Sequence, residues 1–290
     1  LRRVELRLWS IQRKIFGANC RTDIQLGEIP QQPRICDSQA LKLEYRIYND
    51  LAKWWPHISP RESYAAEAHV HLRLIDDALG RTATSILELG CGGGRLAALY
   101  GEDREVVLSD LSPDMLEQSK QHNPAREHVV GDMRSLRLQR TFDAVVIQDA
   151  IMYLTNPDDL AATFETAAQH LEPGGVLLVL PDVVKETFQE GSVSGGSFGH
   201  PTAQLLEWHW DPDAGDDTFQ VDMCLMLRHE GGDMEVIHEQ HQMGLFDRTT
   251  LCRLMREAGF QLVEGTVWEA VDIAEFFTAV KQRAADESRT

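Results

Sequence analysis

The chain has 290 residues with 43% hydrophobic content and a formal net charge of −18. An acidic balance of this size repels phosphate backbones, which argues against a nucleic acid partner. No apolar run reaches bilayer length, and the five cysteines are scattered without a C-x-x-C pair. We therefore expect a cytoplasmic protein with free thiols rather than a membrane protein, a disulfide framework or a zinc site.

The first 80 residues are predicted to form a helical extension. Residues 1–16 place apolar side chains at helical spacing among basic ones, which is typical of a helix packed on its own protein or on a second subunit. Residues 17–40 are rich in Pro and polar residues and indicate a linker. The pattern is helical again over residues 41–79, and Gly80 is expected to end the last helix.

Residues 81–183 repeat a strand followed by a helix. The strands are short apolar runs, and each helical stretch begins after turn or capping residues such as Ser112. Repeated units of this kind predict an α/β core with a parallel, doubly wound sheet. Strands are predicted at residues 85–89, 105–109, 128–130, 142–147 and 176–180, and helices at 95–100, 113–122 and 158–170.

The rhythm changes in the segment 184–245, which is predicted to be an insertion on the substrate side. Its residues 191–199 are expected to form a Gly/Ser loop. Two alternating runs flank Glu230-Gly231-Gly232-Asp233 and predict an antiparallel hairpin. The segment 246–290 is predicted to complete the core. The two strands of the hairpin are predicted at 219–228 and 234–242. Within 246–290, a helix is predicted at 248–258 and closing strands at 261–267 and 276–281.

The stretch Gly90-Cys-Gly-Gly-Gly94 follows the first predicted strand of the core. Gly92, Gly94 and Ala97 satisfy the G-x-G-x-x-G/A form of a dinucleotide site, with an acidic residue at the end of the next strand. A nicotinamide-dependent oxidoreductase is therefore one interpretation. The other is an S-adenosylmethionine site, in which an acidic residue, here Glu88, stands two positions before the first glycine. The loop alone leaves both open.

The segments after the loop separate the two interpretations. Gly131-Asp132-Met133 follows the third strand, the fourth strand leads into Gln148-Asp149, and Leu171-Glu-Pro-Gly-Gly175 precedes the fifth. This succession resembles the class I S-adenosylmethionine-dependent methyltransferases over residues 45–281. The resemblance implies a Rossmann-like, mostly parallel seven-stranded sheet with an N-terminal helical lid and an inserted antiparallel hairpin. It also implies S-adenosylmethionine as the cofactor.

The resemblance also assigns cofactor contacts. Gly90 and Gly92 would let the main chain meet the methionine half, while Asp110 would accept hydrogen bonds from the ribose hydroxyls. Asp132 would accept one from the adenine amino group, with Met133 against the ring. The remaining implied cofactor residues are Glu88 as a support of the loop, Leu111, Gln148 opposite the methyl group, and Tyr64.

Further segments sharpen the resemblance. Tyr48-Asn-Asp-Leu, Ser63-Tyr64-Ala-Ala-Glu-Ala68 and Glu186-Thr-Phe188 look like the N-methyltransferases of nucleotide-linked amino sugars. By that likeness Tyr64 would reach the cofactor carboxylate from a lid helix, the 219–242 hairpin would lie beside the acceptor, and the protein would be a homodimer. The expected function is methyl transfer to a small-molecule amine in sugar or natural-product metabolism. O- and C-methylation are the alternatives.

An amine acceptor must be unprotonated when it attacks, so a carboxylate or phenol near it is expected. Asp149 and Tyr153, after the fourth strand, are the predicted catalytic residues. His238 and His241 are three apart in a predicted strand, so they would face opposite sides; we expect solvent-facing side chains and no metal. The predicted acceptor contacts are Asp182, His200 and Trp208.

Overall fold

The computed structural model describes residues 45–59, 64–196, 202–263 and 275–283, which belong to one unit spanning residues 41–290. The predicted helix at 1–16, the linker at 17–40 and His200 lie outside the described residues. So does the end of the strand predicted at 261–267.

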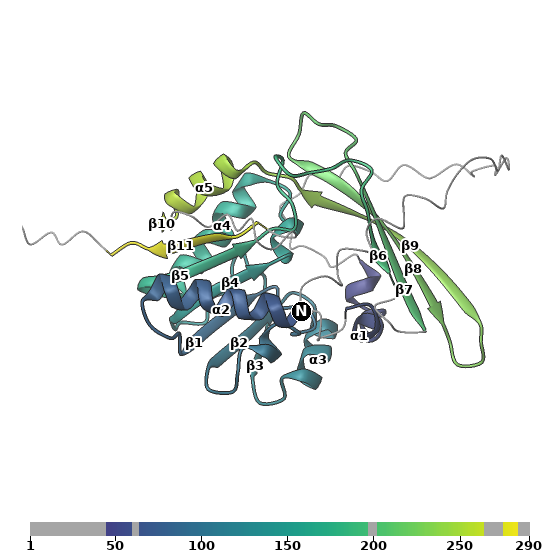
Figure 1. Ribbon diagram of the computed structural model, residues 1–290, viewed down its shortest axis with the longest axis horizontal. Coiled ribbons are helices and arrows are strands. Elements are labelled where there is room, and N and C mark those ends of the chain that lie inside the picture. The colour runs from purple at the N-terminus through teal and green to yellow at the C-terminus, as the bar shows by residue number, and fades with distance from the viewer. Residues whose placement is uncertain (1–44, 60–63, 197–201, 264–274, 284–290) are drawn as a thin grey trace, which may run out of the picture. The chain divides into compact units, whose positions relative to one another are not determined.

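Among the described residues, seven strands form one sheet in the order β10-β11-β5-β4-β1-β2-β3 (Figure 1). Strands β1 to β5 pair in parallel, and β11 runs antiparallel to both β5 and β10. This confirms the mostly parallel seven-stranded sheet. The bounds are β1 Ser85–Leu89, β2 Glu105–Asp110, β3 Glu127–Val130, β4 Phe142–Gln148, β5 Leu171–Leu180, β10 Phe260–Leu262 and β11 Phe277–Lys281.

Helices cover both faces of this sheet, as a doubly wound fold requires. Side chains of α2 and α3 pack in one buried cluster with Ile86 and Val146, and those of α4 and α5 pack in another with Leu87 and Val145. Successive residues of one strand therefore pack in opposite clusters, because their side chains point to opposite faces of the sheet. The helices are η3 Arg46–Tyr48, η4 Ala52–Trp54, α1 Trp55–Ile58, α2 Ala65–Leu79, η6 Ala97–Leu99, α3 Pro113–His122, η7 Ala150–Tyr153, α4 Pro157–Gln169 and α5 Arg248–Glu257.

The helix ends follow local sequence signals. Ser112 caps α3 as predicted, accepting a hydrogen bond from the Met115 amide at 3.0 Å, and Asn156 and Asp247 cap α4 and α5 in the same way. Each cap satisfies an amide that has no partner inside its helix. Gly80 ends α2 in a left-handed conformation with φ 70°.

The helix predicted at residues 95–100 is only a single 3₁₀ turn, η6. The chain turns at Gly101, with φ 86°, and enters β2 at Glu105, so no length remains for an α-helix. Dinucleotide sites place the pyrophosphate on the amino end of a full helix directly after the glycine loop. That feature is missing from this loop.

The insertion is larger than the predicted hairpin. The described residues form a four-stranded antiparallel sheet in the order β6-β7-β8-β9, of which β8–β9 is the predicted hairpin (Figure 1). The prediction of a loop at 191–199 is wrong over β6, where Gly195, with φ 107°, lies so close to Leu205 that no side chain would fit. The bounds are β6 Val193–Gly196, β7 Ala203–Trp210, β8 Thr218–Arg228 and β9 Met234–Gly244.

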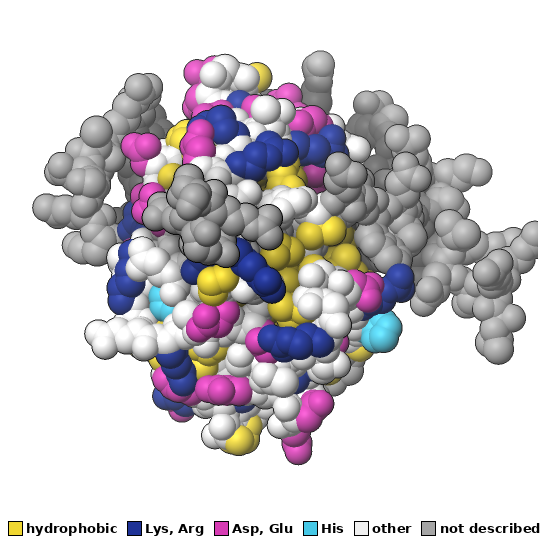
Figure 2. Space-filling view, turned by 90° about the vertical axis from the view of Figure 1, so that its left-hand side faces the viewer, with side chains coloured by type: hydrophobic (Ala, Val, Ile, Leu, Met, Phe, Trp, Pro, Cys, Tyr) yellow, Lys and Arg dark blue, Asp and Glu magenta, His cyan; other side chains and the backbone are white. Residues whose placement is uncertain are grey.

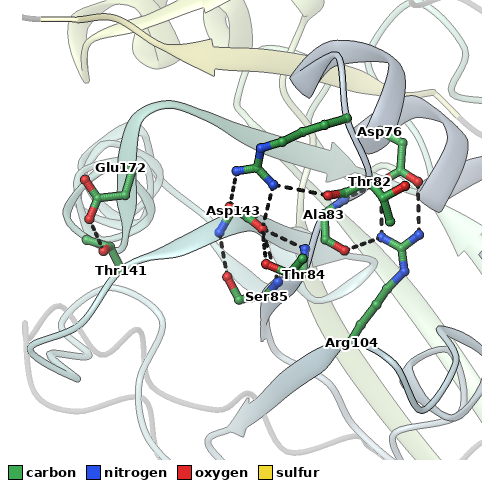
Figure 3. Close-up of polar contacts among 10 residues, drawn as sticks. Asp76, Thr82, Ala83, Thr84, Ser85, Arg104, Thr141, Asp143 and Glu172 are labelled. Carbon is green, nitrogen blue, oxygen red and sulfur yellow. Dashed lines mark hydrogen bonds and ion pairs between the residues drawn. The ribbon is translucent and has the colours of Figure 1, made fainter.

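Polar contacts tie the amino ends of the parallel strands together (Figure 3). Asp143, the one polar residue of β4 before Gln148, accepts hydrogen bonds from the Arg81 guanidinium at 3.0 Å and from the Thr84 amide at 2.6 Å. Beside it, Arg104 holds Asp76 at 2.9 Å. These contacts fix the start of β1 against β4.

The surface mixes charges of both signs. On the face drawn in Figure 2, basic and acidic side chains are interspersed, with an apolar band between them. No helix in the described part of the chain has the length and apolar character needed to span a membrane.

Candidate active site

A cavity of about 870 Å³ lies at the carboxyl ends of the parallel strands. One wall carries Gly90, Asp110 and Asp149, which follow or end β1, β2 and β4. The facing wall carries Leu205 and Phe219 from the inner face of the antiparallel sheet. This is the edge where open α/β sheets bind ligands.

The glycine loop is folded onto the end of β2. The amides of Gly90 and Cys91 both donate to the Ser109 carbonyl, at 2.8 and 3.0 Å. Asp110 accepts from the Gly92 amide at 2.7 Å and from the Ser112 amide at 2.8 Å. Asp110 therefore shapes the loop while its remaining lone pairs stay available.

Glu88 lies near the end of β1, two positions before Gly90. It lines the cavity but makes no hydrogen bond to the loop among the described residues; the loop is supported by Asp110 instead. Burial raises the pKa of Glu88 to about 8, and its Oε2 atom has no hydrogen-bond partner within the described part of the chain.

Three further residues predicted to bind the cofactor follow the ends of β2 and β3. Leu111, Asp132 and Met133 all line the cavity. The Arg134 guanidinium donates a hydrogen bond to Asp132 from Nη2 at 2.7 Å and one to Asp159 from Nη1 at 3.0 Å. Burial opposes ionisation of Asp132, but Arg134 outweighs it and lowers the pKa, so the carboxylate stays charged.

Carboxyl groups from three elements gather at the carboxyl end of β4. Gln148 donates to Glu67 of α2 at 2.7 Å, and Asp149 and Asp182 line the cavity beside it. Burial, and then the charges of Asp182 and Glu67, raise the pKa of Asp149 well above its usual range. Burial raises the pKa of Asp182 to about 6. Burial and the negative charge of Asp182 raise the pKa of Glu67 to about 7. Such a cluster gains stability when a cation binds.

The backbone at Asp149 is strained. It has φ 52° and ψ −46°, a region that non-glycine residues seldom adopt. Its amide donates to the Leu180 carbonyl at 2.9 Å, which holds the turn in place. Strain of this kind costs about 1–3 kcal/mol and is concentrated at functional sites.

Tyr153 belongs to a buried polar chain. Its hydroxyl lies 2.6 Å from that of Tyr48 and 3.0 Å from Nδ1 of His241. The prediction that His241 faces solvent is wrong, because alternate residues of β9 turn inward and its side chain is fully buried. His238 lies on the outer face and pairs with Asp222 at 2.6 Å.

Of two further predicted site residues, Tyr64 lines the cavity and Trp208 does not. Tyr64 lines the cavity and shares a hydrogen bond of 2.7 Å with Ser59. Trp208 does not reach the cavity: its neighbours Glu207 and His209 take the inner face of β7, which leaves Trp208 half exposed on the outer one. The prediction of an acceptor contact at Trp208 is corrected accordingly.

The chain is similar to one protein family, to curated relatives and to solved structures. Residues 86–175 match the family described as a methyltransferase domain. The dTDP-3-amino-3,6-dideoxy-alpha-D-glucopyranose N,N-dimethyltransferase of Streptomyces fradiae is 30% identical over 184 residues, which are 62% of this chain and 71% of that protein. The crystal structure of DesVI from Streptomyces venezuelae superposes with a TM-score of 0.68 at 24% identity, covering 83% of this chain and 99% of that one.

The chain belongs to the S-adenosylmethionine-dependent methyltransferases. A second relative, the dTDP-3-amino-3,4,6-trideoxy-alpha-D-glucopyranose N,N-dimethyltransferase of Streptomyces venezuelae, is 39% identical over 137 residues. That match spans 46% of this chain and 56% of the relative. With the missing helix behind the glycine loop, this membership decides against the nicotinamide interpretation.

The residues of this methyltransferase fit its cofactor. When bound, S-adenosylmethionine supplies a methyl group on a positively charged sulfur. The cavity offers acceptors for such a molecule: Asp110 retains lone pairs, and Oε1 of Gln148 is buried without a hydrogen-bond partner within the described residues. Burial raises the pKa values of Asp149 and Asp182, and a positively charged ligand beside them would favour their ionised forms. These are the positions that the sequence assigned to the ribose, the methyl-bearing end and the acceptor.

Proposed function

We propose that this methyltransferase transfers the methyl group to the amine nitrogen of a small-molecule acceptor, an amino sugar or related amine of natural-product metabolism. The observation that carries the proposal is the pairing of Asp149 with Asp182 in the cavity wall. Burial, and then the charges of Asp182 and Glu67, raise the pKa of Asp149, and burial raises that of Asp182. A cation bound between these crowded carboxyl groups would therefore stabilise their ionised forms. An amine arrives as an ammonium group, whereas an alcohol or a carbon acceptor brings no positive charge.

The rest of the cavity suits a compact polar acceptor. Its inner wall combines Phe188, Phe219 and Met223 with the neutral polar side chains of Gln189 and Ser192. Apolar side chains exclude water from the transfer, and neutral polar ones can bind hydroxyl groups. By their names, the two N,N-dimethyltransferases above act on dTDP-linked amino sugars, and this lining supports an amino-sugar acceptor here.

We assign roles to three residues on this basis. Asp149 and Asp182 hold and orient the ammonium group, and Tyr153 lies on the path by which the acceptor's proton leaves, with its hydroxyl 2.6 Å from that of Tyr48. Holding the nitrogen in line with the methyl group accounts for much of the rate, because methyl transfer needs close and aligned atoms.

Methyl transfer to matched acceptors tests the proposal. The protein is incubated with S-adenosylmethionine labelled in its methyl group and with an amino sugar or the sugar bearing a hydroxyl at the same carbon. We expect the label on the nitrogen of the amino sugar and little label on the hydroxyl sugar. Asp182→Asn should weaken this preference for the amino sugar over the hydroxyl sugar. Transfer to oxygen or carbon with no preference for the amine would contradict the proposal.

The homodimer and the cytoplasmic location that the sequence predicts remain proposals. Analytical ultracentrifugation of the full chain tests the first, with a single species of twice the chain mass expected. Fractionation of the native cells tests the second.

A further inference from the structure

A buried polar chain leads from the cavity away from the carboxyl cluster. Tyr48 of η3 and Tyr153 of η7 line the cavity, and behind them lie His241 and Glu239 of β9. We propose that Tyr48, Tyr153, His241 and Glu239 form a proton relay that removes the acceptor's proton. The proposal rests on the amine acceptor proposed above and adds three residues that the sequence did not assign to catalysis.

The distances connect every step. The two phenol oxygens are 2.6 Å apart, and Tyr153 lies 3.0 Å from Nδ1 of His241. Nε2 of His241 lies 3.4 Å from Oε2 of Glu239. If Nε2 carries the imidazole proton, Nδ1 accepts from Tyr153, Tyr153 accepts from Tyr48, and the oxygen of Tyr48 is left to accept a proton from the cavity.

The segment that carries Tyr48 is attached to the far end of the relay. The amides of Arg46 and Ile47 donate to Glu239 at 2.7 and 3.2 Å. The ring of Tyr45 stacks on His241 with centroids 3.7 Å apart. One carboxylate thus orients the imidazole and anchors the backbone next to Tyr48, so the relay is complete only when this segment is seated on β9.

Proton transfer along the relay balances without a tyrosinate. The ammonium proton passes to the oxygen of Tyr48 as the proton of Tyr48 passes to Tyr153 and that of Tyr153 passes to Nδ1 of His241. The products are a neutral amine and an imidazolium beside the Glu239 carboxylate. Glu239 is partly exposed, with 13% of its side chain accessible, so the proton can leave to water.

The surrounding charges support proton transfer from the acceptor towards His241. Burial opposes ionisation of Glu239, but hydrogen bonds from His241 and from the Arg46 and Ile47 amides lower its pKa, so it remains a carboxylate. Burial raises the pKa of Tyr48 and Tyr153 far above neutrality, and the negative charge of Glu207 raises both further. The phenols therefore pass protons on without losing them for long. The aromatic rings of Tyr45, Tyr48 and Tyr153 also face His241.

Activity as a function of pH tests the relay. His241→Asn keeps an acceptor for Tyr153 but cannot take up a proton. We expect kcat/KM for an amine acceptor to fall roughly 10²-fold at pH 7, a typical contribution of proton transfer. The deficit should shrink as pH rises, by up to about tenfold per unit, because the amine then binds already neutral. His238→Asn, on the outer face of the same strand, is the matched control and should behave as the wild type.

A purely structural role for His241 predicts a deficit that does not change with pH, and that result would overturn the relay. Failure of the proposed function is distinct, because the wild type itself would then methylate no amine. Nitrogen-15 NMR of the histidine rings in the S-adenosylhomocysteine complex adds a readout independent of turnover. The relay requires a neutral His241 protonated at Nε2, and a ring protonated at Nδ1 would exclude it.

Discussion

At the scale of single residues, the site depends on groups that are unfavourable for the fold. Asp149 combines a strained backbone with a buried carboxyl group beside Asp182. Neither feature helps the chain to fold, which supports the binding role proposed for Asp149. The position of Asp149 after β4 made it predictable, because ligands bind at that edge of a parallel sheet.

Replacing Asp149 should separate stability from activity. Asp149→Gly removes the strain and the buried carboxyl, so we expect the free energy of unfolding to increase by about 1–3 kcal/mol. Methyl transfer should fall by roughly 10²-fold, because the acceptor loses its alignment. Denaturant unfolding and initial rates measure the two effects.

Gln139 supplies the matched control for this substitution. It is an exposed residue with φ 55°, and it does not line the cavity. Gln139→Gly should give a similar gain in stability with unchanged activity. A loss of stability on Asp149→Gly would show that the strain is not a cost to the fold.

The site residues that the sequence did not reveal are those contributed by distant segments. Glu67 meets Gln148 across 81 positions, and Tyr153 meets His241 across 88. No local pattern encodes such contacts. Trp208 and His241 show the same difficulty within one strand, because the face that points inward is set by the sheet on which the strand packs.

At the scale of elements, local signals predicted the α/β core and failed in the insertion. Caps, turns and apolar runs are local, so most strands and helices between 85 and 180 could be predicted to within one residue. The exceptions are the helix expected at 95–100, which is a 3₁₀ turn, and β5, which begins at Leu171 and not at 176. Strand β7 was missed because its outer face carries Leu206 and Trp208, both exposed, which hides the alternation. Strand β6 was missed because glycines are rare in strands.

The glycine loop should not tolerate a side chain at Gly90. A Cβ there would lie 2.3 Å from Cβ of Ala150, in addition to the strain of φ 75°. Gly80→Ala, at φ 70° with open space around it, is the matched control. We expect Gly80→Ala to cost about 1–2 kcal/mol of stability. Gly90→Ala should cost more and should also weaken S-adenosylhomocysteine binding. Equal effects of the two substitutions on stability and binding would contradict the close packing.

The amino ends of β1 and β4 should depend on Asp143. Asp143→Asn weakens the contacts from Arg81 and from the Thr84 amide, so we expect a loss of about 1–3 kcal/mol at pH 7. The Arg81 hydrogen bond lowers the pKa of Asp143, so its contribution is present above pH ~4 and is lost as the pH falls further. Asp77→Asn, in an exposed pair with Arg73, should cost less than about 0.5 kcal/mol. Equal losses from both variants would refute this role.

At the scale of the whole molecule, the free protein should become less stable as the pH rises towards about 8. Burial raises the pKa of Glu88 to about 8 and that of Glu67 to about 7, so the folded state binds more protons than the unfolded chain up to those values. Stability then falls with rising pH, by at most about 1.4 kcal/mol per unit for each group. Histidines with lowered pKa, such as His71, act in the opposite direction but only below pH ~6.5.

Thermal unfolding of the free protein between pH 6.5 and pH 8 measures this slope. We expect the midpoint to fall across the range, and Glu88→Gln to flatten the decline, because glutamine does not titrate. An unchanged slope in the variant would show that Glu88 is already charged in the folded protein at neutral pH.

The proposed function requires that the cavity be the cofactor site. Calorimetric titration of S-adenosylhomocysteine into the wild type and into Asp110→Ala tests this directly. We expect one molecule to bind per chain, and the substitution to abolish binding because the ribose partner and the anchor of the Gly92 amide are both lost. Absence of binding to a well-folded wild type, with NADH binding in its place, would contradict the cofactor assignment and the functions derived from it.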